Sequence, residues 1–141
     1  MSLKAFLANN AKLPENTEVF VSNRFVGDDG KPVPFVIKAV TEDVNADIRK
    51  RATPSISIVK GRQVREFDSN KYLTGLCVAS VVEPDLKNSE LQKSYGVIGE
   101  ADLLNAMLLP GEYAVLLSEV QKINGYDNEK FESVKEEVKN S

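Results

Sequence analysis

The sequence predicts an α+β fold, in which a short N-terminal helix and antiparallel β-hairpins pack on a C-terminal multi-helix bundle. In the first half, apolar and polar residues alternate, which is the period of a half-buried strand. From Asp68 onward the apolar residues recur every three or four positions, as in amphipathic helices. The chain has 141 residues, of which 42% are hydrophobic, so one ordinary core can form without disulfides or a metal.

The first half of the chain is expected to contain a short helix followed by a hairpin. Ser2 is a suitable N-cap for a helix over residues 2–9, which is too short to be stable unless its apolar face docks on a surface. Residues 17–25 and 33–40 alternate like paired strands. The glycines, aspartates and prolines between them supply the turn.

A charged helix and a second hairpin are predicted next. Residues 41–52 begin with Thr41 as a suitable N-cap and carry acidic residues in the first turn, where the helix dipole favours them. Val44, Ala46 and Ile48 are the apolar residues that this helix has to bury. Residues 55–67 alternate around a Lys-Gly turn, which indicates a second hairpin; a mobile loop is the alternative.

The second half is predicted to be helical. Asp68 caps a helix that is apolar on most sides and therefore belongs at the centre of the fold, and Pro84 stops it. Short helices follow near residues 88–95 and from residue 99. Pro110 suits the first turn of a last helix, which Asn124-Gly125 ends.

We expect one domain over residues 1–126 and a charged tail over residues 127–141, which is either a marginal helix or disordered. The opening residues lack the apolar run of a secretory signal, and no stretch approaches the roughly 18 uninterrupted apolar residues of a membrane span. Cys77 is the only cysteine, so no intramolecular disulfide can form. The sequence therefore predicts a cytoplasmic protein.

The composition argues against the common catalytic and metal sites. The chain has no histidine, which rules out Ser-His-Asp and Cys-His catalysis and His-ligated zinc. Cys77 is expected to be a buried, inert side chain, and Asp28 and Asp29 are expected to form a turn, because the other oxygen ligands of a calcium loop are missing. Glycine-rich phosphate-binding motifs are absent. We predict no catalytic residue, metal or cofactor.

Two sets of residues are candidates for binding a partner. An apolar set suits a groove for a partner helix, although core packing explains the same spacing. It consists of Tyr95, Leu109 and Tyr113. A basic set lies in a stretch without acidic residues, as in a patch for nucleic acid or an acidic partner, although a solvated loop has the same composition. It consists of Arg49, Lys50, Arg51, Lys60, Arg62 and Arg65. The net charge of −3 argues against nucleic acid as the main partner.

Several longer strings resemble those of a known family. In the second half they are Ser80-Val81-Val82-Glu83-Pro84-Asp85-Leu86, Glu90-Leu91-Gln92-Lys93-Ser94-Tyr95-Gly96-Val97 and Met107-Leu108-Leu109-Pro110-Gly111-Glu112-Tyr113. In the first half they are Leu3-Lys4-Ala5-Phe6-Leu7, Ser22-Asn23-Arg24-Phe25 and Asp29-Gly30-Lys31-Pro32-Val33. On these strings the chain resembles the XkdN-like tail assembly chaperones of PBSX-type phages and prophages, over roughly residues 2–126. Phe35, where the family often has tryptophan, and the less similar segment 53–65 depart from the pattern.

The resemblance implies a non-enzymatic role in phage tail assembly in the host bacterial cytoplasm. Chaperones of this family hold the tape measure protein until tube subunits polymerise around it. The implied partners are the tape measure protein, the tail tube protein and a longer form of the chain made by ribosomal frameshifting, for which Val138-Lys139-Asn140 is compatible with a slippery heptamer. Self-association is open. The alternatives are a structural tail component, a nucleic-acid-binding regulator that uses the basic stretch 49–65, and an unrecognised enzyme.

Overall fold

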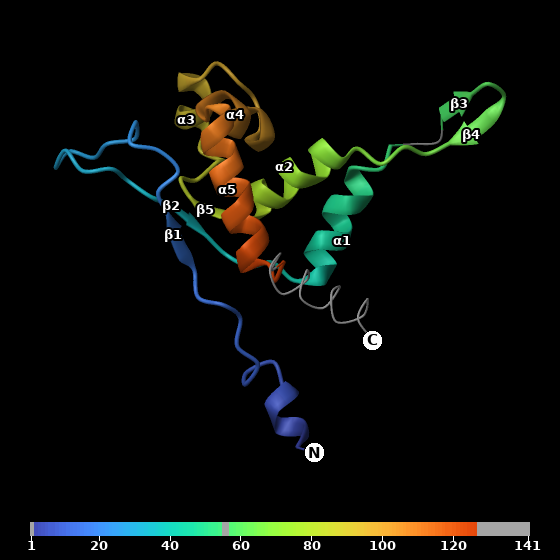
Figure 1. Cartoon of the computed structure of the whole chain (residues 1–141), viewed down its shortest axis with the longest axis horizontal. Coiled ribbons are helices and arrows are strands. Elements are labelled where there is room, and N and C mark those ends of the chain that lie inside the picture. Colours follow the sequence, from blue (N-terminus) through green and yellow to red (C-terminus); the bar gives the residue numbers. More distant parts are fainter. Residues whose placement is uncertain (1, 55–56, 127–141) are drawn as a thin grey trace, which may run out of the picture.

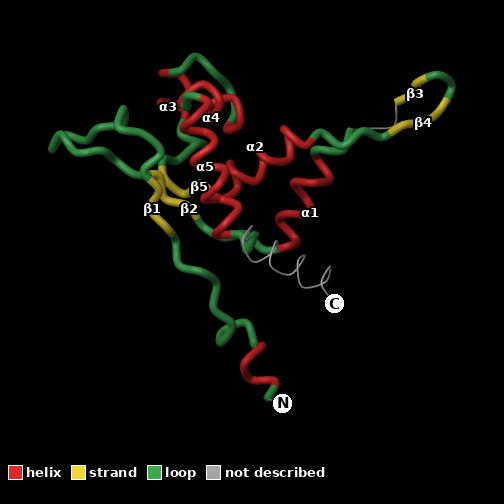
Figure 2. Tube along the Cα trace, in the orientation of Figure 1, coloured by secondary structure: helices red, strands yellow, loops and turns green. Residues whose placement is uncertain are grey.

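The computed structural model describes residues 2–54 and 57–126, which form five α-helices, one turn of 3-10 helix and two small antiparallel sheets (Figures 1 and 2). The predicted α+β class is confirmed. In chain order the elements are η1 (Leu3–Phe6), β1 (Thr17–Val19), β2 (Phe35–Ile37), α1 (Glu42–Arg51), β3 (Ser57–Val59), β4 (Arg62–Val64), α2 (Ser69–Ser80), β5 (Val81–Glu83), α3 (Ser89–Ser94), α4 (Glu100–Met107) and α5 (Pro110–Ile123). The predicted tail, residues 127–141, lies outside the described residues.

Strand β2 is the centre of a three-stranded sheet. It pairs antiparallel with β1, where Val19 lies opposite Phe35, and with β5, where Val81 lies opposite Ile37. The first predicted hairpin is confirmed, but its strands have only three residues each. Strand β5 corrects one sequence prediction. The helix expected to continue toward Pro84 ends at Ser80, and the next three residues form β5. The β-branched residues that follow pair with the free edge of β2 instead of extending the helix.

The core lies between this sheet and the helices α2, α4 and α5. Helix α2 contacts α1, α4 and α5, which confirms the prediction that it is the central helix. The Asp68 carboxylate accepts a hydrogen bond from the Lys71 N–H (3.0 Å), as expected of an N-cap. The largest fully buried side chains are Ile37, Leu76, Cys77, Ser80, Leu103, Leu104, Leu116 and Val120.

A polar link joins the ends of three elements at one side of the core. The Asn124 side chain accepts a hydrogen bond from the Val40 N–H (2.8 Å) and donates one to the Ser80 hydroxyl (3.1 Å). Gly125, which follows, has a φ of 93°, a conformation that glycine adopts without strain. The predicted end of the last helix at Asn124-Gly125 is therefore confirmed, and the asparagine also ties α5 to α2 and to the segment between β2 and α1.

The N-terminal segment is less helical than predicted. Ser2 is the N-cap, since its hydroxyl accepts a hydrogen bond from the Lys4 N–H (3.3 Å), but the helix is a single 3-10 turn with no buried residue. Residues 2–16, called the arm below, run away from the body of the fold (Figure 1). The predicted docking of this helix does not occur within the described chain, because one short turn provides too little structure to hold itself against a surface.

The second hairpin is confirmed. Strands β3 and β4 pair antiparallel, with Val59 opposite Arg62. The two turn residues, Lys60 and Gly61, have φ values of 52° and 78°. Positive φ at both central residues matches the twist of the flanking strands. The hairpin projects from the corner between α1 and α2 and is far from the three-stranded sheet (Figure 1).

Helix α1 packs on α2 at Gly75. A Cβ atom at Gly75 would lie only 2.7 Å from Cγ2 of Ile48, so the close approach of the two helices requires glycine. Val44, predicted to be buried, is 40% exposed. Asn45 is buried instead, because its side chain accepts a hydrogen bond from the Tyr72 hydroxyl of α2.

We predict that Gly75→Ala destabilises the fold by about 1–2 kcal/mol, because the overpacking against Ile48 outweighs the gain of about 1 kcal/mol in helix propensity. Urea unfolding followed by circular dichroism measures the change. Gly111→Ala is the matched control, since no atom lies within 4 Å of a Cβ placed there, and its stability should be unchanged or slightly raised. Equal effects of the two substitutions would contradict the proposed packing.

Candidate partner-binding site

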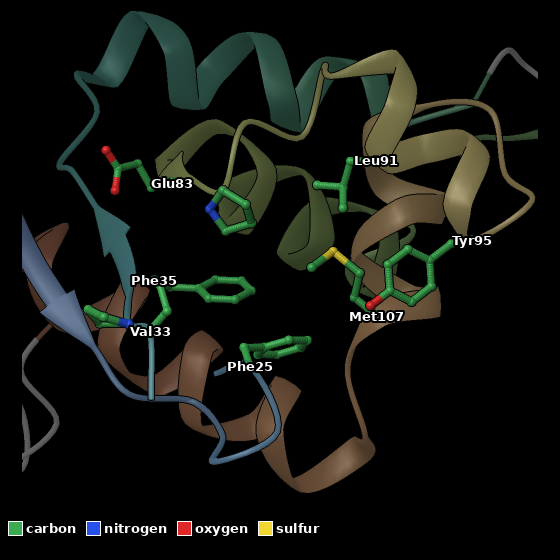
Figure 3. A pocket seen from close by; sticks show the side chains of 9 residues that line it. Phe25, Val33, Phe35, Glu83, Leu91, Tyr95 and Met107 are labelled. Carbon is green, nitrogen blue, oxygen red and sulfur yellow. The ribbon is translucent and has the colours of Figure 1, made fainter. Parts of the chain in front are cut away.

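An apolar pocket of about 380 Å³ opens beside the three-stranded sheet (Figure 3). Its wall comes from the connection between β1 and β2, from β2 itself, from the end of β5 and from helices α3 and α4. The residues that line it are Phe25, Val33, Pro34, Phe35, Glu83, Pro84, Leu91, Tyr95 and Met107. This volume is at the lower end of the about 300–1,000 Å³ that is typical of ligand pockets.

The pocket has an apolar interior and a polar rim. Phe35 and Met107 are only 2% and 5% exposed, and the rings of Phe25 and Phe35 lie with their centroids 5.9 Å apart. Tyr95 is 39% exposed and forms one side of the opening. The Glu83 carboxylate points away from the apolar side chains (Figure 3). An apolar side chain from a partner would therefore enter a preformed space beside a partly exposed aromatic ring.

An ion pair holds the β1–β2 connection against the helical half. The Arg24 Nε donates a hydrogen bond to one oxygen of Glu112 (3.0 Å), and its Nη2 donates to the other. The same Nη2 also donates to the carbonyl oxygen of Met107 (2.8 Å). The guanidinium lies 5.0 Å from the centroid of the Phe25 ring. Arg24 therefore fixes two residues of the pocket wall, Phe25 and Met107, relative to each other.

Glu112 is held in its charged form by several donors. The Arg24 guanidinium, the Ser22 side chain and the Leu109 N–H lower the pKa of Glu112 to about 2, and the Leu109 bond measures 2.8 Å. Glu112 lies in the first turn of α5, where the helix dipole also favours a negative charge. The hydrogen bond to Glu112 in turn raises the pKa of Arg24. The pair is therefore fully charged at neutral pH.

The structure separates the three predicted apolar site residues. Tyr95 lies in the pocket wall. Leu109 is exposed at the N-cap of α5, outside the wall. Tyr113 packs against the core, and its hydroxyl is hydrogen-bonded to that of Thr74 (2.9 Å), so it has a structural role. Of these three, only Tyr95 is thus placed to meet a partner in the pocket.

The predicted basic residues do not form one patch. Arg49 pairs with Glu42 (3.3 Å) and Arg51 pairs with Asp47 (3.1 Å), both along the exposed surface of α1. Lys50 also lies on α1. The remaining three lie on or beside the projecting hairpin, where they make no ion pair with any described residue; they are Lys60, Arg62 and Arg65. Two of the three basic residues on α1 are thus paired with acidic residues, and a separate basic region lies on the hairpin.

The residues that sequence reasoning missed are those in the interior of the pocket. Phe25 and Phe35 lie in the two predicted strands, residues 17–25 and 33–40, but nothing in the spacing connects them with Leu91 and Met107, which come from other elements. Arg24 and Glu112 are 88 residues apart. Each lies in a string of residues that resembles the family, and this resemblance is the one feature of the sequence that could have drawn attention to the pair.

Other chemistry expected from the sequence has a structural explanation. The carboxylate of Asp29 accepts a hydrogen bond from the Lys31 N–H (3.0 Å), as expected of a turn residue. Cys77 is fully buried, and burial raises the pKa of its thiol to about 12. In the part of the chain that the structure describes, no three acidic or cysteine side chains are grouped closely enough to hold a metal ion. No helix of that part has both the length and the apolar character needed to cross a membrane.

Comparison with known proteins decides the family. The sequence model described as "Phage XkdN-like tail assembly chaperone protein" matches residues 3–139. The chain belongs to this family. Two relatives of this XkdN-like chaperone family are found in Bacillus subtilis strain 168. The uncharacterized protein YqbN is 34% identical over 140 residues, and the protein XkdN of the phage-like element PBSX is 29% identical over 140 residues. Each match covers 98% of this chain and 93% of the relative.

The fold agrees with a solved structure of one relative. The crystal structure of YqbN superposes with a TM-score of 0.78 at 30% identity, and the match covers 90% of this chain and 98% of the YqbN chain. The resemblance found in the sequence is therefore confirmed for this XkdN-like chaperone, and so is its α+β architecture.

We predict that the ion pair makes stability depend on acidity. Because the folded pKa of Glu112 is depressed to about 2, its contribution is complete above the ordinary value of about 4.5 and is lost as the pH falls toward 2. Urea midpoints measured across this range should show that Glu112→Gln is less stable than wild type at neutral pH, with the two curves converging in acid. A curve for Glu112→Gln that runs parallel to the wild-type curve would contradict the assignment.

Proposed function

We propose that this chain is a non-enzymatic tail assembly chaperone that binds the tape measure protein and keeps it soluble in the host cytoplasm until the tube forms around it. Membership of the XkdN-like family supports the role in tail assembly. The observation that carries the binding proposal is the preformed apolar pocket with Tyr95 at its opening.

The chemistry of the pocket suits a long helical client. An amphipathic helix that has not yet found its final partner exposes an apolar stripe, and such a stripe aggregates in water unless it is covered. A pocket that accepts one large side chain, beside a partly exposed aromatic ring, is the usual arrangement of an interface hot spot. A charged rim keeps the free chaperone soluble and leaves the contact reversible.

Other apolar side chains of the helical half are also available to contact the client. Several large apolar side chains of the segment from β5 to α5 are exposed to solvent. They are Val82, Tyr95, Ile98, Leu109 and Val115. A client held by one side chain in the pocket can therefore spread over a wider apolar surface, which a transient complex needs to exclude water around its anchor.

We predict that Tyr95 is an anchor for the client. Co-expression with the tape measure protein encoded nearby should raise the soluble fraction of that protein and yield a complex. Tyr95→Asp should weaken the complex by about 10-fold or more, because it places a charge at an apolar contact. Ile58→Asp is the matched control, since Ile58 is exposed but lies on the β3–β4 hairpin, away from the pocket and from this apolar surface. Continued aggregation of the client beside the wild-type chain, or equal effects of the two variants, would contradict the proposal.

We further expect the chain to be absent from finished particles. A chaperone leaves the client when the tube closes around it, whereas a structural tail component stays in many copies. Mass spectrometry of purified tails distinguishes the two. Recovery of this chain in amounts similar to the tube subunit would favour the structural role.

A further inference from the structure

The arm leaves apolar side chains without a partner. Leu3, Phe6, Leu7 and Leu13 are all exposed, and Phe6 is 67% exposed. In the described chain the hydrogen bonds of residues 2–11 stay within the arm, including one from the Asn10 side chain to the Lys4 carbonyl oxygen (2.8 Å). The arm therefore has a local shape but contributes nothing to the core.

We propose that two copies of this chain exchange their arms, so that Phe6 of one copy enters the pocket of the other beside Tyr95. Each copy supplies both halves of this contact, an exposed apolar arm and an open apolar pocket. Burial of both removes apolar surface from water at two symmetric places.

The direction of the arm points to a second copy rather than to the chain's own pocket. The arm leaves the sheet at Thr17, the first residue of β1, while the pocket is built from the connection that follows the other end of β1 (Figures 1 and 3). The arm thus runs away from its own pocket. Its ten residues 7–16 span up to about 33 Å when extended, which is enough to cross the surface of a neighbouring domain.

The charges near the contact have opposite signs. Lys4 stands two residues before Phe6 in the arm, and Glu83 is one of the residues that line the pocket, so the arm and the pocket attract each other at short range.

Arm exchange would also regulate the pocket. A second copy and a client would compete for the same space, so the dimer keeps the pocket covered until a client displaces the arm. This competition rests on the function proposed above, whereas the dimer itself requires only the chain. The two can therefore be tested separately.

Sedimentation of the purified chain tests the dimer. The wild type should be dimeric, and Phe6→Asp should weaken the dimer by about 10-fold or more, because the charge cannot enter the pocket. Ile58→Asp is the matched control, because Ile58 is 76% exposed but lies on the distant β3–β4 hairpin (Figure 1). A monomeric wild type, or a dimer that Phe6→Asp leaves intact, would overturn the proposal.

Disulfide trapping locates the contact. A mixture of the single variants Phe6→Cys and Tyr95→Cys should form a mixed disulfide between two chains, and the buried Cys77 should not interfere. A variant that carries both substitutions and closes the disulfide within one chain would overturn the exchange. When the client is added, Phe6→Asp should bind it more tightly than wild type does. Equal affinities of wild type and Phe6→Asp for the client would contradict competition between the arm and the client. The dimer would still be tested by the disulfide trapping.

Discussion

The contact between Arg24 and Glu112 is the constraint on which the pocket depends. Strands β1 and β2 have three residues each, so strand pairing alone holds little of the long connection between them. The guanidinium binds both oxygens of Glu112 and the Met107 carbonyl, which fixes that connection against the turn between α4 and α5. Such bidentate pairing fixes orientation as well as distance. The pocket is the space that remains between the fixed connection, the sheet and α3.

The molecule separates the surfaces that stabilise it from those that remain exposed. The buried residues gather around α2, whose contacts with α1, α4 and α5 hold the helical half together. The arm, the β3–β4 hairpin and the rim of the pocket leave large apolar side chains in contact with solvent. A protein that covers other chains temporarily requires this division, because its binding surface has to be available without loss of the fold.

The parts of the fold that could be predicted from sequence have local causes. Asp68 and Pro110 mark helix starts because capping and first-turn geometry depend on neighbouring residues. Strand β5 was missed because it exists only by pairing with β2, which is distant in sequence. The apolar spacing of the arm predicts an amphipathic helix, but it does not show whether the fold offers a surface on which this helix can pack. The pocket combines residues from Phe25 to Met107, and the spacing of residues along the chain cannot show which distant residues come together. Conversely, the basic stretch is nearly continuous in sequence, but the fold divides it between α1 and the β3–β4 hairpin.

If the proposed function is right, the apolar pocket, and not the basic hairpin, receives the client. Nuclear magnetic resonance of the isotope-labelled chain, titrated with a soluble helical fragment of the tape measure protein, distinguishes the two surfaces. We expect the largest chemical-shift changes at the methyl groups of Leu91 and Met107 and at Tyr95. Shifts confined to the residues of β3 and β4, or none at saturating fragment, would contradict this expectation.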